Sequence, residues 1–452
     1  MTVTVNLRAR LARAPFAAAA AACLLSLAAF WLAQRAAHVT MLDLSVYRAE
    51  GETVLAGGDL YAMRATSANL PTTYPPFAAL LFTPLTLLGV PEMRTLATAG
   101  NLLLLVALVR LSLRLVRPEA PARALWTAAL WASAVLVWCE PVWTTLRYGQ
   151  INLLIAVAVL WDFTRREGHW GARWAGLGTG LATAVKLTPG LFVVLMLVVG
   201  VLRLRRGGVP GRAWGDPWLR KAVTATAVFL VVTVVSAVVL PYDSRRFWTR
   251  MIFETSRVGR KEETANQSLN GVIARLLHTT DPGVWWLLAA VVVGAAGLAV
   301  AVLAALRGDR PVAVVACGVT ALLVSPISWS HHWVWCVPAL VLLASRVRPG
   351  WTAAVGLVFA SFALWWVPHA PAPVRLELHQ NPGQMLLSGL YTLVGLALLA
   401  VFALRLRHEG RTASGPAPAA DDRVHLPAQA TGDSPREAGD QAAAGDQALA
   451  KE

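Results

Sequence analysis

Long apolar segments recur along this chain of 452 residues, from about residue 16 to about residue 405. Only 14% of the residues are charged and 56% are hydrophobic, whereas a soluble domain holds about 25% charged residues. A helix crosses a bilayer with about 20 apolar residues, and with fewer where it is broken or buried in protein. The sequence therefore predicts an all-α polytopic membrane protein rather than a row of soluble domains.

The apolar segments predict about twelve transmembrane helices, with a range of roughly 10–13. They are expected near 15–37, 95–116, 122–139, 150–163, 175–186, 190–202, 220–240, 284–306, 311–327, 333–345, 351–367 and 384–405. The stretch 76–90 is short and interrupted by prolines, so we expect it to be re-entrant or interfacial. The segment 15–37 resembles a signal sequence, but its apolar run continues so far that we expect it to remain as the first helix.

Residues 175–202 allow two interpretations, a single long span or a hairpin. Basic clusters lie at both ends, with Arg165 and Arg173 before the segment and Arg203 after it. Positive charge favours the cytoplasm, and Pro189 cannot continue a helical hydrogen-bond ladder. This pattern favours a hairpin with Lys186 at its tip.

Basic residues are distributed unequally when the predicted helices alternate across the membrane. With the N-terminus in the cytoplasm, the cytoplasmic ends hold 22 basic and 4 acidic residues, and the opposite side holds 14 basic and 12 acidic residues. The positive-inside rule then predicts a multi-pass protein of the plasma membrane with both termini in the cytoplasm. Loops 38–94 and 241–283 face outward in this topology.

The chain is predicted to divide into a transmembrane domain, 1–408, and a cytoplasmic tail, 409–452. The tail is rich in Ala, Pro, Gly and Asp without periodicity, so we expect it to be disordered. The formal net charge of +15 does not indicate nucleic-acid binding, because the basic residues lie in short loops beside apolar segments. Membrane lipids are the expected surroundings.

Polar residues gather at the outer ends of the predicted helices. A polar side chain at membrane depth is energetically costly, so the presence of each one has to be explained. The candidates are Asp43, Tyr47, Tyr74, Glu140, Gln150, Asn152, Lys186, Arg257, Arg260, Asn266, Gln267, His331 and His332. A carboxylate beside an apolar wall acts as a general base when desolvation raises its pKa. Lysine and arginine hold phosphate, and aromatic rings stack on sugars. Together these groups suit glycosyl transfer from a lipid phosphate.

Each candidate also has a plainer interpretation. Asp43 is equally suited to cap a helix, and Lys186 to extend from a helix end to the interface. The arginines around Arg257 suit anionic lipid headgroups as well as a donor phosphate. The His331–His332 pair is a poor metal site, because adjacent side chains diverge and no further ligand has suitable spacing. We therefore expect neither a metal nor a cofactor.

Several short motifs, in this order, resemble glycosyltransferase family 87 of actinobacteria. They are Asp43-Leu-Ser-Val-Tyr47, Leu60-Tyr61, Tyr74-Pro75-Pro76, Pro84-Leu85, Gly149-Gln150-Ile151-Asn152, Lys186-Leu187-Thr188-Pro189, Asn266-Gln267-Ser268 and Ser325-Pro326-Ile327-Ser328-Trp329-Ser330-His331-His332. The resemblance covers residues 38–345, most of the membrane part.

The resemblance implies a C-type glycosyltransferase (GT-C) fold and an inverting, metal-independent transfer on the outer face of the membrane. Its best-described members are α-1,2-mannosyltransferases that use polyprenyl-phosphate mannose and act on phosphatidylinositol mannosides and related lipoglycans. The family's acidic base matches Asp43, and its late histidine matches His331 or His332. Lys186, with an arginine such as Arg257 or Arg260, would offset charge on the leaving phosphate.

Three other functions remain open at this point. An arabinofuranosyltransferase using decaprenyl-phosphate arabinose would have the same scaffold, and no residue separates the two sugars. A transporter or flippase of lipid-linked substrates would use broken helices, but its polar groups usually lie near mid-membrane. A scaffold without chemistry is the third, and it would tolerate replacement of Asp43 and His332.

Overall fold

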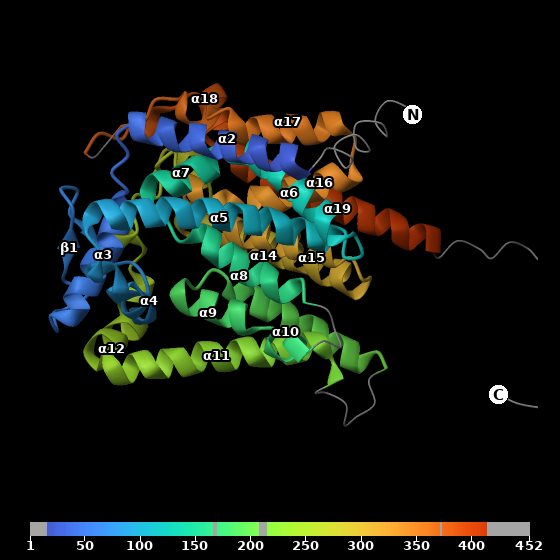
Figure 1. The fold of residues 1–452 in the computed structure, drawn as a ribbon, viewed down its shortest axis with the longest axis horizontal. Helices are drawn as coiled ribbons and strands as arrows, with labels where there is room; N and C mark the ends of the chain where they lie inside the picture. Colours follow the sequence, from blue (N-terminus) through green and yellow to red (C-terminus); the bar gives the residue numbers. More distant parts are fainter. Residues whose placement is uncertain (1–15, 166–169, 208–214, 371–372, 414–452) are drawn as a thin grey trace, which may run out of the picture. The chain divides into compact units, whose positions relative to one another are not determined.

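The computed structural model describes residues 16–165, 170–207, 215–370 and 373–413, and these residues are mostly helical (Figure 1). Within these ranges, five helices are long and apolar enough to cross a membrane: α2 (Phe16–Ala36), α5 (Val90–Val116), α11 (Pro217–Val239), α14 (Gly283–Leu306) and α19 (Leu390–Ala413). Exposed Val, Leu and Trp side chains cover much of α11 and α14, as expected of helices that face lipid. The chain is therefore a helical membrane protein.

The remaining predicted spans are shorter or bent, so the count of twelve is not established. A sixth span exists if α6 (Ala122–Leu136) and α7 (Glu140–Tyr148) are one segment, but they meet at an angle of 80°. Five others are helices of 9–16 residues: α8 (Asn152–Phe163), α9 (Leu177–Val185), α10 (Gly190–Arg205), α15 (Arg310–Val324) and α16 (Cys336–Arg346). The last predicted span before α19 becomes α17 (Pro349–Ala360) and the 3₁₀ turn η7 (Ala363–Trp365).

The segment 175–202 is a hairpin. Gly176 before α9 and Gly200 near the end of α10 both pack against the first turns of α11, where an added Cβ would lie 2.4 Å from the Lys221 carbonyl oxygen and 2.7 Å from the Leu219 nitrogen. The two helices are therefore antiparallel, and the turn between them carries Lys186. The preference for a hairpin is confirmed.

Loop 38–94 is largely structured. It contains α3 (Leu42–Leu55), the antiparallel two-stranded sheet of β1 (Arg64–Ala65) and β2 (Leu70–Pro71), α4 (Pro76–Phe82) and the 3₁₀ turn η1 (Thr83–Leu87). A Cβ on Gly51 would lie 2.8 Å from the Phe82 carbonyl oxygen, so α3 lies directly on α4. The apolar stretch 76–90 is thus a short bent element before α5, and its depth in the bilayer stays a prediction.

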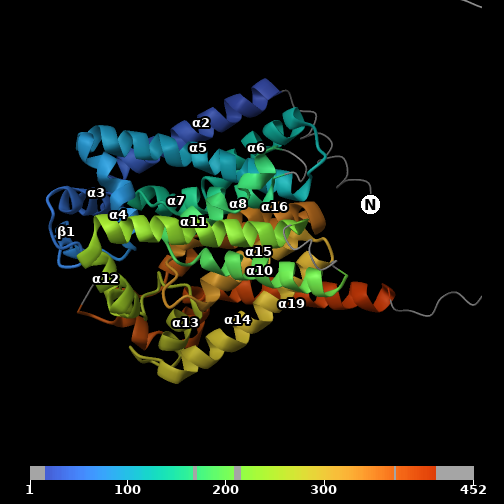
Figure 2. The same cartoon turned by 90° about the horizontal axis from the view of Figure 1, so that it is seen from below.

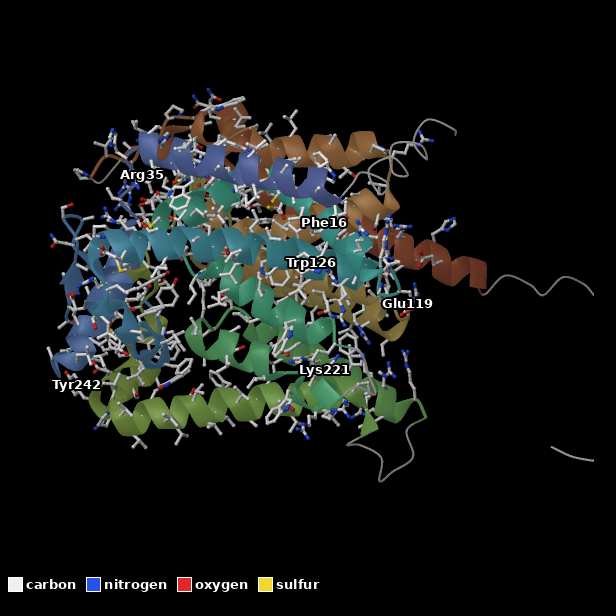
Figure 3. The ribbon with its side chains drawn as sticks, in the orientation of Figure 1. Phe16, Arg35, Glu119, Trp126, Lys221 and Tyr242 are labelled. Carbon is white, nitrogen blue, oxygen red and sulfur yellow. The ribbon has the colours of Figure 1, made fainter. Side chains whose placement is uncertain are left out.

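Loop 241–283 and its neighbours gather at the same end of the helices as α3 and α4 (Figure 2). The loop contains α12 (Pro241–Thr249), the 3₁₀ turns η4 (Met251–Phe253) and η5 (Thr255–Arg257), and α13 (Leu269–Leu276). Arg35 and Tyr242 mark this end in Figure 3, whereas Phe16, Glu119 and Lys221 lie toward the other end. The candidate polar residues therefore face a common end.

Four further short elements complete the described chain: η2 (Trp170–Trp174), η6 (Ser330–Trp335), η8 (Leu376–His379) and α18 (Pro382–Ser388). The described residues up to His408 form one compact unit. Residues 414–452, which make up most of the predicted tail, lie outside the described residues.

Candidate active site

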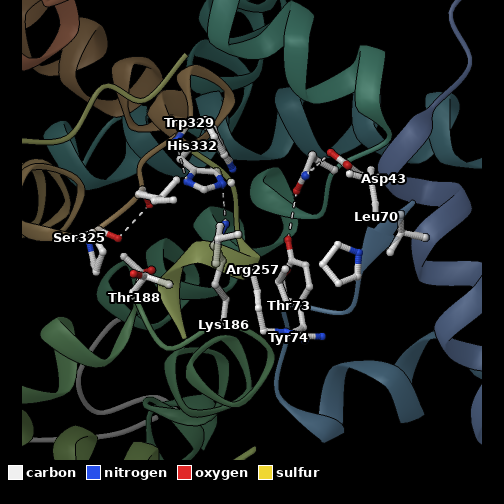
Figure 4. A pocket seen from close by; sticks show the side chains of 18 of the residues that line it. Asp43, Leu70, Thr73, Tyr74, Lys186, Thr188, Arg257, Ser325, Trp329 and His332 are labelled. Atoms are coloured by element: carbon white, nitrogen blue, oxygen red, sulfur yellow. Dashed lines mark hydrogen bonds between the residues drawn. The ribbon is translucent and has the colours of Figure 1, made fainter. Parts of the chain in front are cut away.

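A cavity of about 480 Å³ opens at the end of the helices marked by α3 and α12. Its walls come from separate parts of the chain: α3, β2 and the segment after it, the α7–α8 turn, the turn between α9 and α10, residues 247–265, residues 325–332, and Trp365 of η7. Figure 4 shows Asp43 on one side of the pocket and Lys186 with His332 on the other. Residues nearly 300 positions apart in the sequence thus face the same space.

Asp43 lies in the first turn of α3, where the positive end of the helix dipole favours a carboxylate. The Gln150 side-chain amide donates a hydrogen bond to its Oδ2 atom. Burial raises the pKa of Asp43 to about 6, while the hydrogen bond from Gln150 and the charge of Lys186 act in the opposite direction. Asp43 is therefore ionised near neutral pH yet basic enough to accept a proton.

Two tyrosines hold Gln150 in place. The Tyr47 and Tyr74 hydroxyls donate to Gln150 Oε1 at 2.8 and 3.2 Å, and the two hydroxyl oxygens lie 2.9 Å apart. Tyr47 follows Asp43 by one helical turn, so both side chains project from the same face of α3. Gly149 has a φ of +69°, which lets this turn lie against Leu44. Asp43, Tyr47, Tyr74 and Gln150 all line the cavity.

Lys186 is held on the opposite wall by polar side chains from α8 and η6. Its Nζ atom lies 2.8 Å from His332 Nε2 and 3.2 Å from Asn152 Oδ1. It also lies 5.8 Å from the centre of the Tyr74 ring, which joins this wall to the Asp43 side. Burial lowers the pKa of Lys186 to about 7, and the charge of Asp43 acts in the opposite direction.

Both histidines line the cavity in different surroundings. His332 contacts Lys186, whereas the His331 ring packs edge-on against Tyr148 at 5.4 Å. The His331 carbonyl oxygen accepts hydrogen bonds from Thr145 and Asn152, which fixes the start of η6. Burial lowers the pKa of both imidazoles well below the ordinary value, so both rings are neutral at physiological pH.

The two candidate arginines differ in position. Arg257 lines the cavity, and its Nη2 atom donates to the Tyr61 carbonyl oxygen at 2.8 Å. Arg260 does not line the cavity, because its guanidinium binds Glu263 and the carbonyl oxygens of Ala370 and Val374. Of the two arginines, only Arg257 lines the cavity that Lys186 also lines.

Three other candidates, Glu140, Asn266 and Gln267, are buried behind the cavity and do not line it. Glu140 accepts hydrogen bonds from four side chains, those of Thr144, Ser330, Trp365 and Tyr391. The Asn266 side chain joins the Lys261 carbonyl oxygen to the Ser328 amide, and the Gln267 side chain binds backbone atoms of Thr264, Ser388 and Tyr391. These positions indicate that the three side chains support the cavity wall rather than contact the substrate directly.

The family profile of glycosyltransferase family 87 matches residues 73–326, more than half of the chain. The chain belongs to glycosyltransferase family 87. The resemblance seen in the motifs is thereby confirmed, and the protein is a glycosyltransferase. No solved structure matches the chain.

Curated relatives cover most of this chain. Two are each named polyprenol-phosphate-mannose-dependent alpha-(1-2)-phosphatidylinositol mannoside mannosyltransferase. The one from Mycobacterium tuberculosis (strain ATCC 25618 / H37Rv) is 31% identical over 383 residues, 80% of this chain and 84% of the relative. The one from Mycolicibacterium smegmatis (strain ATCC 700084 / mc(2)155) is 34% identical over 394 residues, 80% and 83%.

A third relative is named a polyprenol-phosphate-mannose-dependent alpha-(1-2)-phosphatidylinositol pentamannoside mannosyltransferase, from Mycobacterium tuberculosis (strain CDC 1551 / Oshkosh). It is 35% identical over 319 residues, 68% of this chain and 68% of the relative. The names of these relatives thus share a donor and a class of acceptor.

Sequence reasoning missed a second carboxylate in this glycosyltransferase. Glu50 is fully buried in α3, and neither of its carboxylate oxygens has a hydrogen-bond partner among the described residues. Burial, and less strongly the charge of Asp43, raise the pKa of Glu50 to about 8. It is therefore protonated near neutral pH. Its spacing of seven residues from Asp43 was the available signal, since i and i+7 share a helix face.

Metal-ligating side chains are not clustered in the part of the chain that the structure describes, where no three His, Cys, Asp or Glu residues are grouped to hold an ion. Two tryptophans add apolar surface to the site instead. Trp329 and Trp365 both line the cavity, together with Tyr148. Such rings suit the apolar faces of a sugar.

Proposed function

We propose that this protein transfers mannose from a polyprenyl-phosphate donor to a hydroxyl of a phosphatidylinositol mannoside or related lipoglycan, forming an α-linkage. The observation that carries the proposal is that Asp43 and Lys186 face one cavity from opposite walls (Figure 4). The names of the relatives support the donor and the acceptor.

The reaction is a single displacement in this proposal. The acceptor hydroxyl attacks the anomeric carbon, and its proton passes to the Asp43 carboxylate. The bond between the anomeric carbon and the phosphate oxygen breaks, and polyprenyl phosphate leaves. Gln150 orients the carboxylate, because its amide is fixed by the Tyr47 and Tyr74 hydroxyls.

Charge on the leaving phosphate is offset by Lys186 and Arg257, which both line the cavity. Apolar side chains lie next to them. Leu187, Phe247, Met251 and Ile252 line the same cavity and pack in one hydrophobic cluster. We assign this apolar wall to the first isoprene units of the donor, and the wall of Trp329 and Trp365 to sugar.

The membrane arrangement belongs to the same proposal. A GT-C fold of about twelve membrane segments would place the cavity at the outer face and both termini in the cytoplasm. The broken and short helices support re-entrant or partly buried segments rather than twelve full-length spans. Cysteine accessibility at Tyr242 and at Arg307, which lie on opposite sides in this topology, tests it with an impermeant thiol reagent.

The decisive test is an assay of membranes that contain the full-length protein with radiolabelled polyprenyl-phosphate mannose and phosphatidylinositol mannosides. Asp43→Asn should lower the rate by about 10²- to 10⁴-fold, since this is the contribution of a general base. Glu52→Gln is the matched control, an exposed carboxylate on the same helix. Full activity of Asp43→Asn at normal expression would contradict the mechanism. Transfer from decaprenyl-phosphate arabinose alone would show that the donor sugar is arabinose and not mannose.

A further inference from the structure

The His332 imidazole has both ring nitrogens engaged. Its Nδ1 atom faces the backbone N–H of Trp329 at 3.2 Å, and its Nε2 atom faces Lys186 Nζ at 2.8 Å. The backbone group can only donate, so Nδ1 is the acceptor and carries no hydrogen. The single proton of a neutral imidazole is then on Nε2 and points at Lys186.

This tautomer restricts the charge on Lys186. An ammonium has three hydrogens and no lone pair, so it cannot accept the Nε2–H bond. A neutral amine accepts from His332 and still donates to Asn152 Oδ1 at 3.2 Å. The orientation of the Asn152 amide is fixed independently, because its nitrogen donates to the His331 carbonyl oxygen. Only the neutral amine satisfies every contact.

The charges around Lys186 agree with a neutral amine. Within the described residues Lys186 forms no ion pair. The groups that face it or share its cavity are Asp43 and Tyr47 from α3, Tyr74, Tyr148, Arg257 from η5, Glu254 and Glu263, and the two neutral imidazoles of η6. Burial disfavours the ammonium, and Asp43 is too far away to form a salt bridge that would reverse this effect.

We propose that Lys186 is an uncharged amine before the donor binds, held in that state by His332, and that it takes up one proton from solvent when the donor phosphate binds. The proposal rests on the proposed function, because the phosphate is that of the donor. Once protonated, the ammonium turns a hydrogen from the His332 side to a phosphate oxygen. His332 is thus a positioning residue that acts through Lys186.

As a consequence, Lys186 carries its positive charge only while the donor phosphate is bound. A buried ammonium without a partner would be costly. The donor is a phosphodiester with no proton that titrates near neutral pH, so an uptake on binding must come to a protein group. Above the pKa of the free amine, about 7, donor affinity should fall about tenfold per pH unit.

Proton uptake is measured by titration calorimetry of the full-length protein in lipid nanodiscs with polyprenyl-phosphate mannose and no acceptor. Binding enthalpies in buffers of different ionisation enthalpy give the number of protons taken up. At about pH 8 we expect close to one proton per donor. Lys186→Arg should bind the donor with uptake near zero, because a guanidinium stays charged. His332→Ala should move the uptake midpoint to higher pH.

Asp43 is the other group that could gain a proton when an anion binds nearby. The Asp43→Asn variant therefore distinguishes proton uptake by Asp43 from proton uptake by Lys186. Uptake should persist in Asp43→Asn, with its midpoint shifted to lower pH, because the Asp43 charge favours the ammonium. Loss of uptake in Asp43→Asn, or binding by the unaltered protein without uptake at about pH 8, would overturn the proposal. Failure of the donor to bind at all would instead count against the proposed function.

Discussion

The Gln150 side chain donates a hydrogen bond to the Asp43 carboxylate from 107 residues farther along the chain. The Oε1 atom of the same side chain accepts hydrogen bonds from the hydroxyls of Tyr47 and Tyr74. The amide nitrogen of Gln150 therefore points toward Asp43. A carboxylate in the first turn of α3 is thereby aimed into the cavity by a residue of the α7–α8 turn.

Gln150→Ala should lower kcat by about 10- to 100-fold, since a hydrogen bond to a charged group contributes about 1.5–3 kcal/mol. The KM for the donor should change little, because the phosphate contacts on the other wall remain. Initial rates in nanodiscs, normalised to folded protein, provide the measurement. Gln384→Ala removes a glutamine from the exposed start of α18 and serves as the control. Equal losses in both variants would show a general effect on folding.

The dependence of kcat/KM on pH should be bell-shaped, because this quantity reports the free enzyme. Asp43 must be ionised to accept a proton, and its pKa is raised to about 6, so the rate should fall below that pH. Lys186 must be charged to hold phosphate, and its pKa is lowered to about 7, so the rate should fall above that pH. Lys186→Arg should remove the alkaline limb and leave the acid limb in place.

Arg257→Ala should raise the donor KM by about tenfold, because a charge-assisted hydrogen bond to phosphate is lost. Arg260→Ala should leave the donor KM unchanged and lower the melting temperature instead, because its guanidinium ties three carbonyl or carboxylate groups together. Steady-state kinetics and thermal unfolding of both variants provide the comparison. A larger rise in the donor KM for Arg260→Ala than for Arg257→Ala would show that the donor phosphate does not bind beside Arg257.

Ile252→Trp should impair long-chain donors more than short ones, because the added ring would occupy the apolar wall assigned to the prenyl chain. We expect the ratio of kcat/KM for a decaprenyl to a ten-carbon phosphate donor to fall by about tenfold, on the order of one large apolar contact. Phe253→Trp is the matched control, since its side chain is 75% exposed. An unchanged ratio in Ile252→Trp would exclude this wall.

Glu140→Ala should reduce stability rather than substrate affinity. The carboxylate receives hydrogen bonds from α7, η6, η7 and α19, so its removal leaves several buried donors unpaired. The expected loss is at least about 2 kcal/mol, read from thermal unfolding in detergent. The stability of Glu140→Gln should lie between those of Glu140→Ala and the unaltered protein. Glu92→Ala, which changes an exposed side chain, should be as stable as the unaltered protein. A selective rise in KM without destabilisation would restore the role in substrate binding.

The sequence allowed much of the site to be anticipated, because intramembrane and juxtamembrane polar groups are few and each needs a partner. Asp43, Lys186 and the histidine pair were expected in one pocket, and the structure brings them there. The hairpin was also foreseeable, since basic clusters at both ends of an apolar segment favour a hairpin over a single crossing.

Other features depend on side-chain direction, which spacing along the chain does not fix. Glu140, Asn266 and Gln267 are as polar as Gln150, yet they point into the protein and bind its own loops. Arg257 and Arg260 are three residues apart in an irregular segment, and Arg260 is held away from the cavity by Glu263, Glu377 and two backbone carbonyl oxygens. The number of crossings was uncertain because buried helices can be shorter than a bilayer is thick.

Gly259 has a φ of +146° and lies so close to Trp329 that an added Cβ would be 2.5 Å from the indole ring. The backbone of Trp329 in turn fixes the tautomer of His332. A methyl group at position 259 would therefore push on the indole of the residue whose backbone sets the imidazole tautomer. Packing in the cavity wall is in this way connected, through Trp329 and His332, to Lys186.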